Sequence, residues 1–217
     1  FLIPGTDVSI GFGGRIKLDG IHDRDAIGST DSFVTSSIPV PEVASDGNTV
    51  FHARDTRLHM EVRSPSQVGA IRGYVEGNFF GSGNSFVLRH AYAETEQLLA
   101  GQTWTNFMMI DSRPETLDFE GPDSSIFLRQ GQLRWTEKLG SELHGSVALE
   151  DPGSDVLAPA GSAPEQVYPD FTVGLRRDHS EGHLFLSGIL RQIGYSGTSS
   201  DSVLGWGASL SGRVPTW

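Results

Sequence analysis

The sequence of 217 residues contains no cysteine, which excludes a disulfide framework and a metal site built from thiolates. It also lacks any apolar run of the ~20 residues that a membrane-spanning helix needs, so a helical membrane protein is excluded. Basic residues are outnumbered, because 16 Lys and Arg stand against 27 Asp and Glu, for a net charge of −11. Phosphate binding needs clustered positive charge, and this balance therefore argues against nucleic acid as a partner.

Signals of targeting and of catalysis are also missing. Residues 1–4 form a short apolar block with no basic segment before it, so we expect no signal peptide in this sequence. The glycine-rich stretches 11–14 and 81–83 are followed by neither a Lys-Ser/Thr pair nor a predicted helix, unlike phosphate loops. The seven histidines lack metal-ligand spacing, and nothing places a Ser/His/Asp constellation. We therefore expect no cofactor, no metal and no enzymatic activity.

What the sequence has instead is an alternation of apolar and polar residues with a period of two. In residues 58–63, for example, Leu58, Met60 and Val62 alternate with charged or polar residues. Such alternation predicts strands with one apolar and one polar face. It is found in 9–23, 52–63, 70–80, 143–150, 171–178, 184–191 and 204–213, and less cleanly in 87–94 and 126–136. We count about ten strands, most close to the ~9–11 residues that cross a bilayer with tilt.

The predicted connections alternate in length along the chain. Short, turn-like links are expected at 64–69, 95–97, 138–141 and 180–182. Longer links rich in Gly, Pro, Ser and Asp are expected at 24–49, 103–125, 151–168 and 194–202, and only 81–85 is short where a long link is due. Short turns at one rim and long loops at the other are typical of an up-and-down membrane barrel, whereas a Greek-key sandwich mixes both lengths. The sequence favours one all-β domain over 1–217, a transmembrane antiparallel up-and-down β-barrel.

In a barrel the apolar faces would contact lipid and the charged faces would line the lumen. The predicted lumen then holds the basic residues Arg15, Lys17, Arg57, Arg63, Arg72, Arg89, Arg129, Arg176 and Arg213. A wall rich in arginine inside a low-dielectric shell raises the local concentration of anions, and guanidinium binds carboxylate through paired hydrogen bonds. We expect these residues to form an anion pathway. The alternative is that each arginine pairs with a neighbouring Asp or Glu and has only a structural role.

The link 103–125 is longer than a barrel rim needs, and links of this length are usually functional or a sign of a misassigned element. Its charged residues are five acids and one base: Asp111, Arg113, Glu115, Asp118, Glu120 and Asp123. Folding the link into the lumen would narrow the pore and place its acids opposite the arginines of the wall. We predict that it is a pore-constricting loop, and the alternative is an ordinary exposed acidic loop.

Several segments resemble the DcaP-like family of outer-membrane porins. They are GTDVSIGFGGRIKLDGIHD at 5–23, FHARDTRLHMEVRSP at 51–65, YVEGNFFGSGN at 74–84, LLAGQTWTNFMM at 98–109, PETLDFEGP at 114–122 and FLRQGQLRW at 127–135. The resemblance covers nearly the whole chain. It implies that the AGQTW and PETLDFEGP segments belong to the loop that folds into the pore.

The resemblance further implies a homotrimeric outer-membrane barrel of about 16 strands that passes small anionic solutes such as dicarboxylates. Lipid and lipopolysaccharide would then be its surroundings. Because only about ten strands are predicted, we expect the chain to be an N-terminal portion of the barrel, incomplete at its C-terminus. Two other interpretations stay open, a soluble secreted β-sandwich that binds carbohydrate or another ligand, and an outer-membrane barrel hydrolase.

Overall fold

The computed structural model describes the chain except for residues 26, 42–46, 68, 114–125, 154–155 and 215–217. Its strands are β1 (Ser9–Arg15), β2 (Asp19–Asp23), β3 (Asn48–His52), β4 (Arg57–Ser66), β5 (Gly69–Asn78), β6 (Val87–Glu94), β7 (Leu98–Trp104), β8 (Arg129–Lys138), β9 (Leu143–Glu150), β10 (Ser162–Pro164), β11 (Asp170–His179), β12 (Gly182–Gly197) and β13 (Asp201–Arg213). Three single-turn 3-10 helices are η1 (Thr35–Ser37), η2 (Ser82–Asn84) and η3 (Ile110–Ser112). None of the helices in this described part is long and apolar enough to cross a membrane.

Eleven strands form one antiparallel sheet in the order β1-β4-β5-β6-β7-β8-β9-β11-β12, with β10 and β13 both paired to β12. Neighbours in the sheet are thus nearly always neighbours in sequence, which confirms the predicted up-and-down arrangement. Such an order differs from the long return connection of a Greek-key sandwich. The sheet is open, with β1 at one end and β13 near the other.

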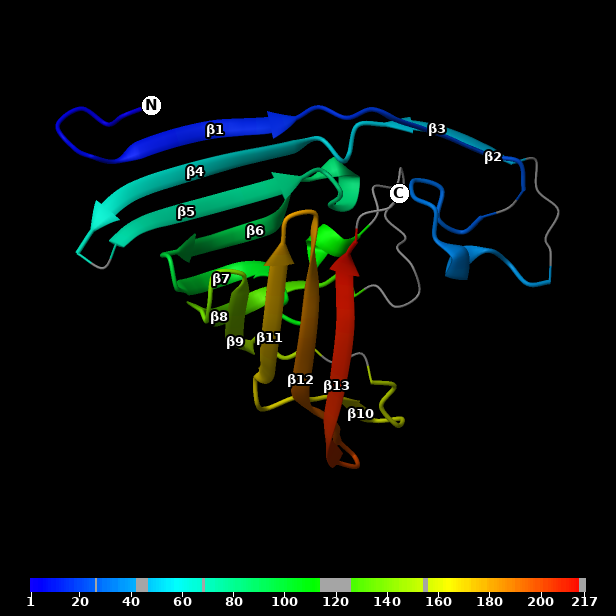
Figure 1. Cartoon of the computed structure of the whole chain (residues 1–217). Helices are drawn as coiled ribbons and strands as arrows, with labels where there is room; N and C mark the ends of the chain where they lie inside the picture. The colour runs from blue at the N-terminus through cyan, green and yellow to red at the C-terminus, as the bar shows by residue number, and fades with distance from the viewer. Residues whose placement is uncertain (26, 42–46, 68, 114–125, 154–155, 215–217) are drawn as a thin grey trace.

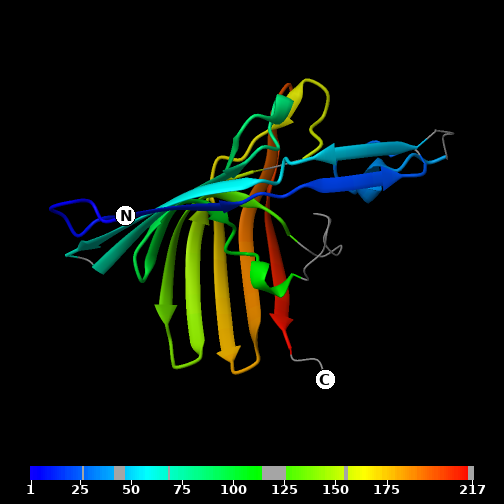
Figure 2. The ribbon, with the colours of Figure 1, turned by 90° about the horizontal axis from the view of Figure 1, so that it is seen from above.

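Two of the predicted strands are interrupted. The expected strands 9–23 and 52–63 are each split, because β2 and β3 pair with each other as a separate hairpin beyond the ends of β1 and β4. This hairpin projects from the sheet in both views (Figures 1 and 2). The split falls at a turn in which the Thr56 amide donates to the Ala53 carbonyl at 3.0 Å. The turn takes residues 53–56 out of the strand ladder, which an alternation pattern cannot reveal.

Two predicted links also differ from the structure. The expected long link 194–202 is wrong, because β12 continues to Gly197 and β13 begins at Asp201. Their ladder still pairs Tyr195 with Asp201, so a segment rich in Gly and Ser remains extended. The link 151–168 contains the short strand β10. The strand predicted at 126–136 runs instead from Arg129 to Lys138. A composition rich in Gly and Ser predicts a loop, but in β12 and β13 backbone pairing with the neighbouring strand overrides this preference.

The burial pattern of the sheet is inverted relative to a soluble protein. Among the described residues only three hydrophobic side chains are buried, Leu99, Ala148 and Phe185, whereas fourteen polar or charged ones are. Along β11 and β12 the leucines and valines are exposed and alternate with buried polar residues. One face of each strand therefore carries the apolar residues outward, as a lipid-facing strand does. A sandwich would bury that face in a core.

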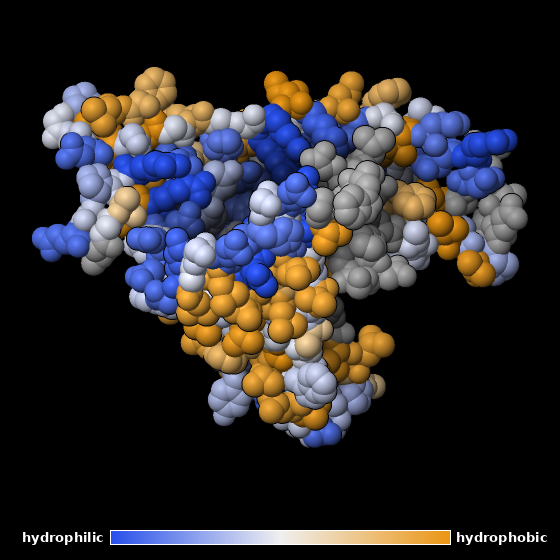
Figure 3. All heavy atoms as spheres, viewed as in Figure 1, coloured by the Kyte–Doolittle hydropathy of each residue, from blue (hydrophilic) through white to orange (hydrophobic). Residues whose placement is uncertain are grey.

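The sheet curls so that its polar faces look toward each other. In Figure 1, β11, β12 and β13 pass in front of β7–β9, while β4–β6 lie behind and above. The same view as spheres shows a mainly hydrophobic surface over β11–β13 and a hydrophilic one over β4–β6 (Figure 3). The front strands thus show their outer face and the rear strands their inner face. The polar faces line the inside of the curve.

Candidate functional site

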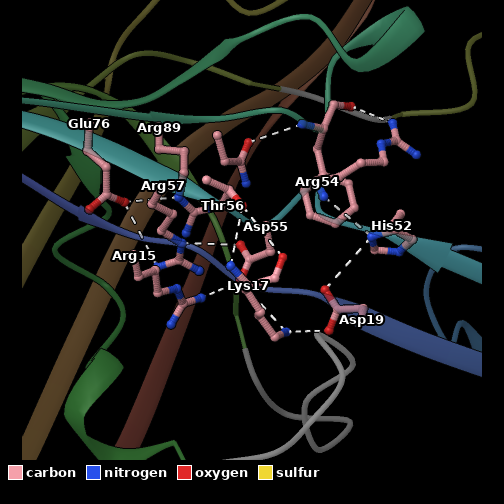
Figure 4. Close-up of polar contacts among 12 residues, drawn as sticks. Arg15, Lys17, Asp19, His52, Arg54, Asp55, Thr56, Arg57, Glu76 and Arg89 are labelled. Carbon is pink, nitrogen blue, oxygen red and sulfur yellow. Dashed lines mark hydrogen bonds and ion pairs between the residues drawn. The ribbon is translucent and has the colours of Figure 1, made fainter.

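The first cluster on the inner face is centred on Asp55, a fully buried carboxylate in the turn between β3 and β4. Arg57 donates from Nε to Asp55 Oδ1 at 3.2 Å, and Arg15 donates to Oδ2 (Figure 4). Lys17 Nζ lies 3.8 Å from the same Oδ2. Arg15 and Arg57 are direct partners in the β1–β4 register, so Asp55 offsets the repulsion between two facing guanidinium groups.

Neighbouring positive charge, rather than burial, decides the protonation state of the Asp55 carboxyl. Burial alone would raise the pKa of this carboxyl, but Arg57 and Arg15 outweigh that effect and hold its pKa below the usual value of 3.8. Asp55 is therefore ionised at neutral pH and acts as a structural counter-ion.

A second carboxylate, Glu76 on β5, extends the cluster along the wall. Its Oε1 lies 3.1 Å from Arg89 Nε and 3.9 Å from Arg57 Nη1. Its Oε2 accepts a hydrogen bond from the Tyr74 hydroxyl at 2.9 Å. Arg57 therefore bridges Asp55 and Glu76, and the predicted residues Arg15, Lys17, Arg57 and Arg89 are brought together in one network (Figure 4).

Arg89 reaches this network because of a β-bulge. The β5–β6 register shifts between Glu76 and Gly77, so that Arg89 and its neighbour His90 are both buried, at 6% and 8% exposure. A bulge places consecutive side chains on the same side of the sheet. This explains why the faces of 87–94 could not be fixed from alternation alone.

A second cluster lies nearer the short turns, around Arg72. Its Nε is 2.7 Å from Glu61 and its Nη1 is 2.8 Å from Glu94. Arg63 faces Arg72 across the β4–β5 ladder and also pairs with Glu61, again placing one carboxylate between two facing arginines. Both guanidinium groups of this cluster form ion pairs with carboxylates.

Arg129 at the start of β8 differs from all of these. It forms no ion pair within the described part of the chain, and its Nη1 is buried with no hydrogen-bond acceptor. Its guanidinium carbon instead lies 4.4 Å from the centre of the Trp104 ring and 5.6 Å from that of Phe127. It is close enough to Arg57 and Arg89 to repel them. Arg129 thus adds positive charge to the first network without a carboxylate of its own.

The segment after β7 is attached to the inner wall by a buried carboxylate, Glu150 at the end of β9. Glu150 is 1% exposed and accepts hydrogen bonds from the Thr105 hydroxyl at 2.5 Å and the backbone N–H of Asn106 at 2.6 Å. Thr172 on β11 donates to it at 2.9 Å, and Gln130 on β8 donates as well. Four donors from three parts of the chain therefore fix the start of the loop against β8, β9 and β11.

The same segment continues across the inner face toward β12. Ser187 donates to the Phe107 carbonyl at 2.8 Å, and Ser112 lies 3.0 Å from His183 Nε2. Asp111 is 3.1 Å from Arg176 Nη1, and Arg176 is also paired with Asp178. Residues 105–113 thus lie on the polar wall. Glu115, Asp118 and Glu120 lie outside the described residues.

Other parts of the site were missed or misplaced by sequence reasoning. Arg134 on β8 points to the inner face beside residues 105–110, and the unclear alternation of 126–136 concealed it. The anchoring role of Glu150 had no sequence signal, because its donors lie 20 to 45 residues away. Arg213 is exposed at the end of β13, where it is the register partner of His183 on β12. Within the described chain no group of three His, Asp or Glu could hold a metal.

An apolar outer face, a polar inner wall and a segment folded onto that wall define part of an outer-membrane β-barrel. The family model described as DcaP outer membrane protein matches residues 3–214. The chain therefore belongs to the DcaP outer membrane protein family, and its location is the bacterial outer membrane. Membership of this family also confirms the expectation that the chain is not an enzyme.

One solved structure agrees with the family at the level of the fold. The chain is similar to the outer membrane channel DcaP of Acinetobacter baumannii, with a TM-score of 0.85 and 21% identity over 98% of this chain. The match covers 61% of that channel, so the chain spans about three fifths of its length. A loop-deletion mutant of OmpT from Vibrio cholerae matches at a TM-score of 0.41 and 10% identity, over 96% of this chain and 78% of that one, too distant to support an inference. No curated protein sequence matches the chain.

Proposed function

We propose that the whole protein is a passive diffusion channel for small organic anions, dicarboxylates among them, and that this chain forms part of its wall and constriction. The single observation that carries the proposal is the Arg129 guanidinium, which lies beside Arg57 and Arg89 and has no carboxylate partner among the described residues. Among the described residues of this region, the basic side chains Arg15, Lys17, Arg57, Arg89 and Arg129 outnumber the carboxylates Asp19, Asp55 and Glu76 that they contact. A passing carboxylate would find both positive potential and hydrogen-bond donors there.

The physical basis is the surroundings of these charges. A wall that has apolar strand faces behind it focuses the field into the lumen, which raises the local concentration of anions. The contact with the Trp104 ring helps to hold the Arg129 guanidinium in place without using a carboxylate. Rings of Arg and Lys are a known means of favouring anions in pores.

Residues 105–113 would act as the size filter of this channel. The Glu150 anchor and the Asp111–Arg176 pair hold them against the wall, which supports a segment that narrows the lumen rather than an exposed loop. The rest of the loop, including the acids predicted for the constriction, is proposed to complete the filter. Assembly as a homotrimer within lipid and lipopolysaccharide also belongs to this proposal.

The test is the ion selectivity of the full-length protein in planar bilayers. Under a KCl gradient the reversal potential should show a preference for chloride, and Arg129→Gln should reduce it. Arg63→Gln is the matched control, because Arg63 is paired with Glu61 and 65% exposed, where solvent screens its charge. A wild-type channel without anion preference, or an Arg129→Gln channel indistinguishable from the wild type, would contradict the proposal.

A further inference from the structure

A pocket lies between the inserted segment and the wall, apart from the clusters on β1, β4 and β5. Its volume is about 250 Å³, and it is bounded by residues of the segment and by the inner faces of β8, β9, β11 and β12. The residues that matter for its chemistry are Trp104, Met108, Met109, Ile110, Arg134 and Phe185. Its size suits a small organic molecule or a group of waters.

Arg134 is the one residue of this lining whose charge is not matched by a direct partner. It is half-buried, and it makes no hydrogen bond or ion pair within the described part of the chain. The carboxylates that act on it most strongly are Glu150 and Glu94. Glu150 is already bound by Thr105 and Asn106, and Glu94 by Arg72. The Arg134 guanidinium therefore retains donors for a ligand.

The second arginine of the pocket, Arg176, is not available in the same way. Its Nε is 2.8 Å from Asp178, and its Nη1 is 3.1 Å from Asp111 and 3.3 Å from the Met109 sulfur. The pocket thus offers one guanidinium for an anionic group and not two. A second carboxylate on the ligand would find no second available guanidinium in this lining.

The remaining lining combines apolar side chains with the polar residues Thr103, Thr105, Asn106, Thr136, His144 and Ser146. Met108, Met109 and Ile110 come from the inserted segment, and Phe185, one of the few buried hydrophobic residues, comes from β12. Methionine side chains adapt to the shape of a ligand, and aromatic rings pack well against another ring. An apolar body next to the carboxylate would displace water from these side chains, whereas a second charge would be desolvated at a cost.

We infer that this pocket is a binding site for an organic monocarboxylate with an apolar body, held through Arg134. The inference rests on the proposed channel function. It adds a second binding site, of different chemistry, to the pathway of the solute. Arg129 lies at the start of β8 next to the long loop, and Arg134 lies further along the strand toward the short turn after Lys138. A solute that enters past Arg129 would reach the Arg134 pocket next. Trp104 contacts the first arginine and lines the pocket of the second.

The experiment measures block of the chloride current through the full-length protein in planar bilayers by benzoate and by succinate. Benzoate should block at a lower concentration than succinate, and Arg134→Gln should raise the half-blocking concentration of benzoate about tenfold, the effect of losing one charge-assisted hydrogen-bonded contact. Arg177→Gln is the control, since Arg177 is 69% exposed and pairs with Glu142 at 3.8 Å. Heat-modifiable gel mobility shows that each variant is folded.

A second variant tests the apolar part of the pocket. Phe185→Leu should weaken block by benzoate while leaving block by acetate unchanged. Unchanged benzoate block in a folded Arg134→Gln channel, or equal block by succinate and benzoate in the wild type, would overturn the inference and leave an anion-selective channel standing. A wild-type channel that shows no anion preference would instead refute the proposed function itself.

Discussion

Two parts of the inner wall carry arginines in opposite circumstances. On β4 and β5, Arg57 and Arg72 each contact two carboxylates, and each faces another arginine across the ladder with a carboxylate between them. On β8, Arg129 and Arg134 form no ion pair among the described residues. Carboxylates therefore neutralise the arginines of the first part, whereas those of the second part have no carboxylate partner among the described residues.

This difference separates two roles of positive charge. Arginines on neighbouring antiparallel strands repel, so a wall with facing arginines needs carboxylates to hold it together. An arginine that is used in this way no longer has all its donors for binding. Of the residues expected to bind anions, we therefore propose that Arg57 and Arg72 contribute mainly to the wall and that Arg129 contacts the solute, together with Arg134.

The largest expected effect comes from removing the anchor that keeps the inserted segment next to β8. Glu150→Ala should leave the Thr105 hydroxyl, the Asn106 amide and Gln130 without an acceptor in a buried place. We expect a loss of about 3 kcal/mol in stability and a clear rise in single-channel conductance. Thermal unfolding in detergent and bilayer recording check the two parts. Glu142→Ala, which alters an exposed pair, should change neither.

A smaller effect should follow from breaking the paired wall. Asp55→Asn leaves Arg15 and Arg57 facing each other without a counter-charge, and it should cost about 2 kcal/mol because Asp55 is buried although its partners are partly exposed. Thermal unfolding at pH 7 measures the loss. Stability equal to the wild type would mean that this carboxylate does not hold the facing arginines together.

At acid pH, the difference in stability between the wild type and the Asp55→Asn variant should disappear. The folded-state pKa of Asp55 is lowered, so its contribution is present above the unfolded pKa of about 3.9 and is lost as pH falls through the folded value. Unfolding of both proteins between pH 7 and pH 2 should therefore converge at the acid end. A gap that stays constant over this range would rule out a role for the Asp55 charge.

The smallest effect tests whether a paired arginine can be converted into a free one. Glu76→Gln removes the carboxylate that Arg89 contacts at 3.1 Å and Arg57 at 3.9 Å. The chloride-to-potassium permeability ratio should rise, by about twofold, because two guanidinium groups regain donors and a negative charge is lost. Reversal potentials measure this ratio. A fall in anion preference would show that pairing is not what limits these arginines.

Much of the fold could be predicted from the sequence. Alternation identified the strands because one face meets lipid and the other the lumen, so that each residue such as Leu184 or Ser187 has only one suitable side. What could not be predicted lies where alternation fails. The bulge beside Gly77 turned Arg89 and His90 to the same side, and the turn at 53–56 separated β3 from β4.

The site was predictable in its composition and not in its pairing. The sequence shows which strands carry arginine, and it shows that acids lie among them. It does not show that Arg129 stacks on Trp104 while Arg89 reaches Glu76, since those outcomes depend on register and on where a strand starts. Pairing is a property of the assembled sheet, and here pairing determines the proposed role of each arginine.

The most direct test compares two double variants of the full-length protein, Arg129→Gln with Arg134→Gln and Arg57→Gln with Arg72→Gln. Both remove the same formal charge, so the change in long-range field is similar and the difference reports direct binding. The half-blocking concentration of benzoate should rise at least tenfold more in the first variant than in the second. An equal rise in both, or a larger one in the second, would contradict the claim that unpaired arginines bind the solute.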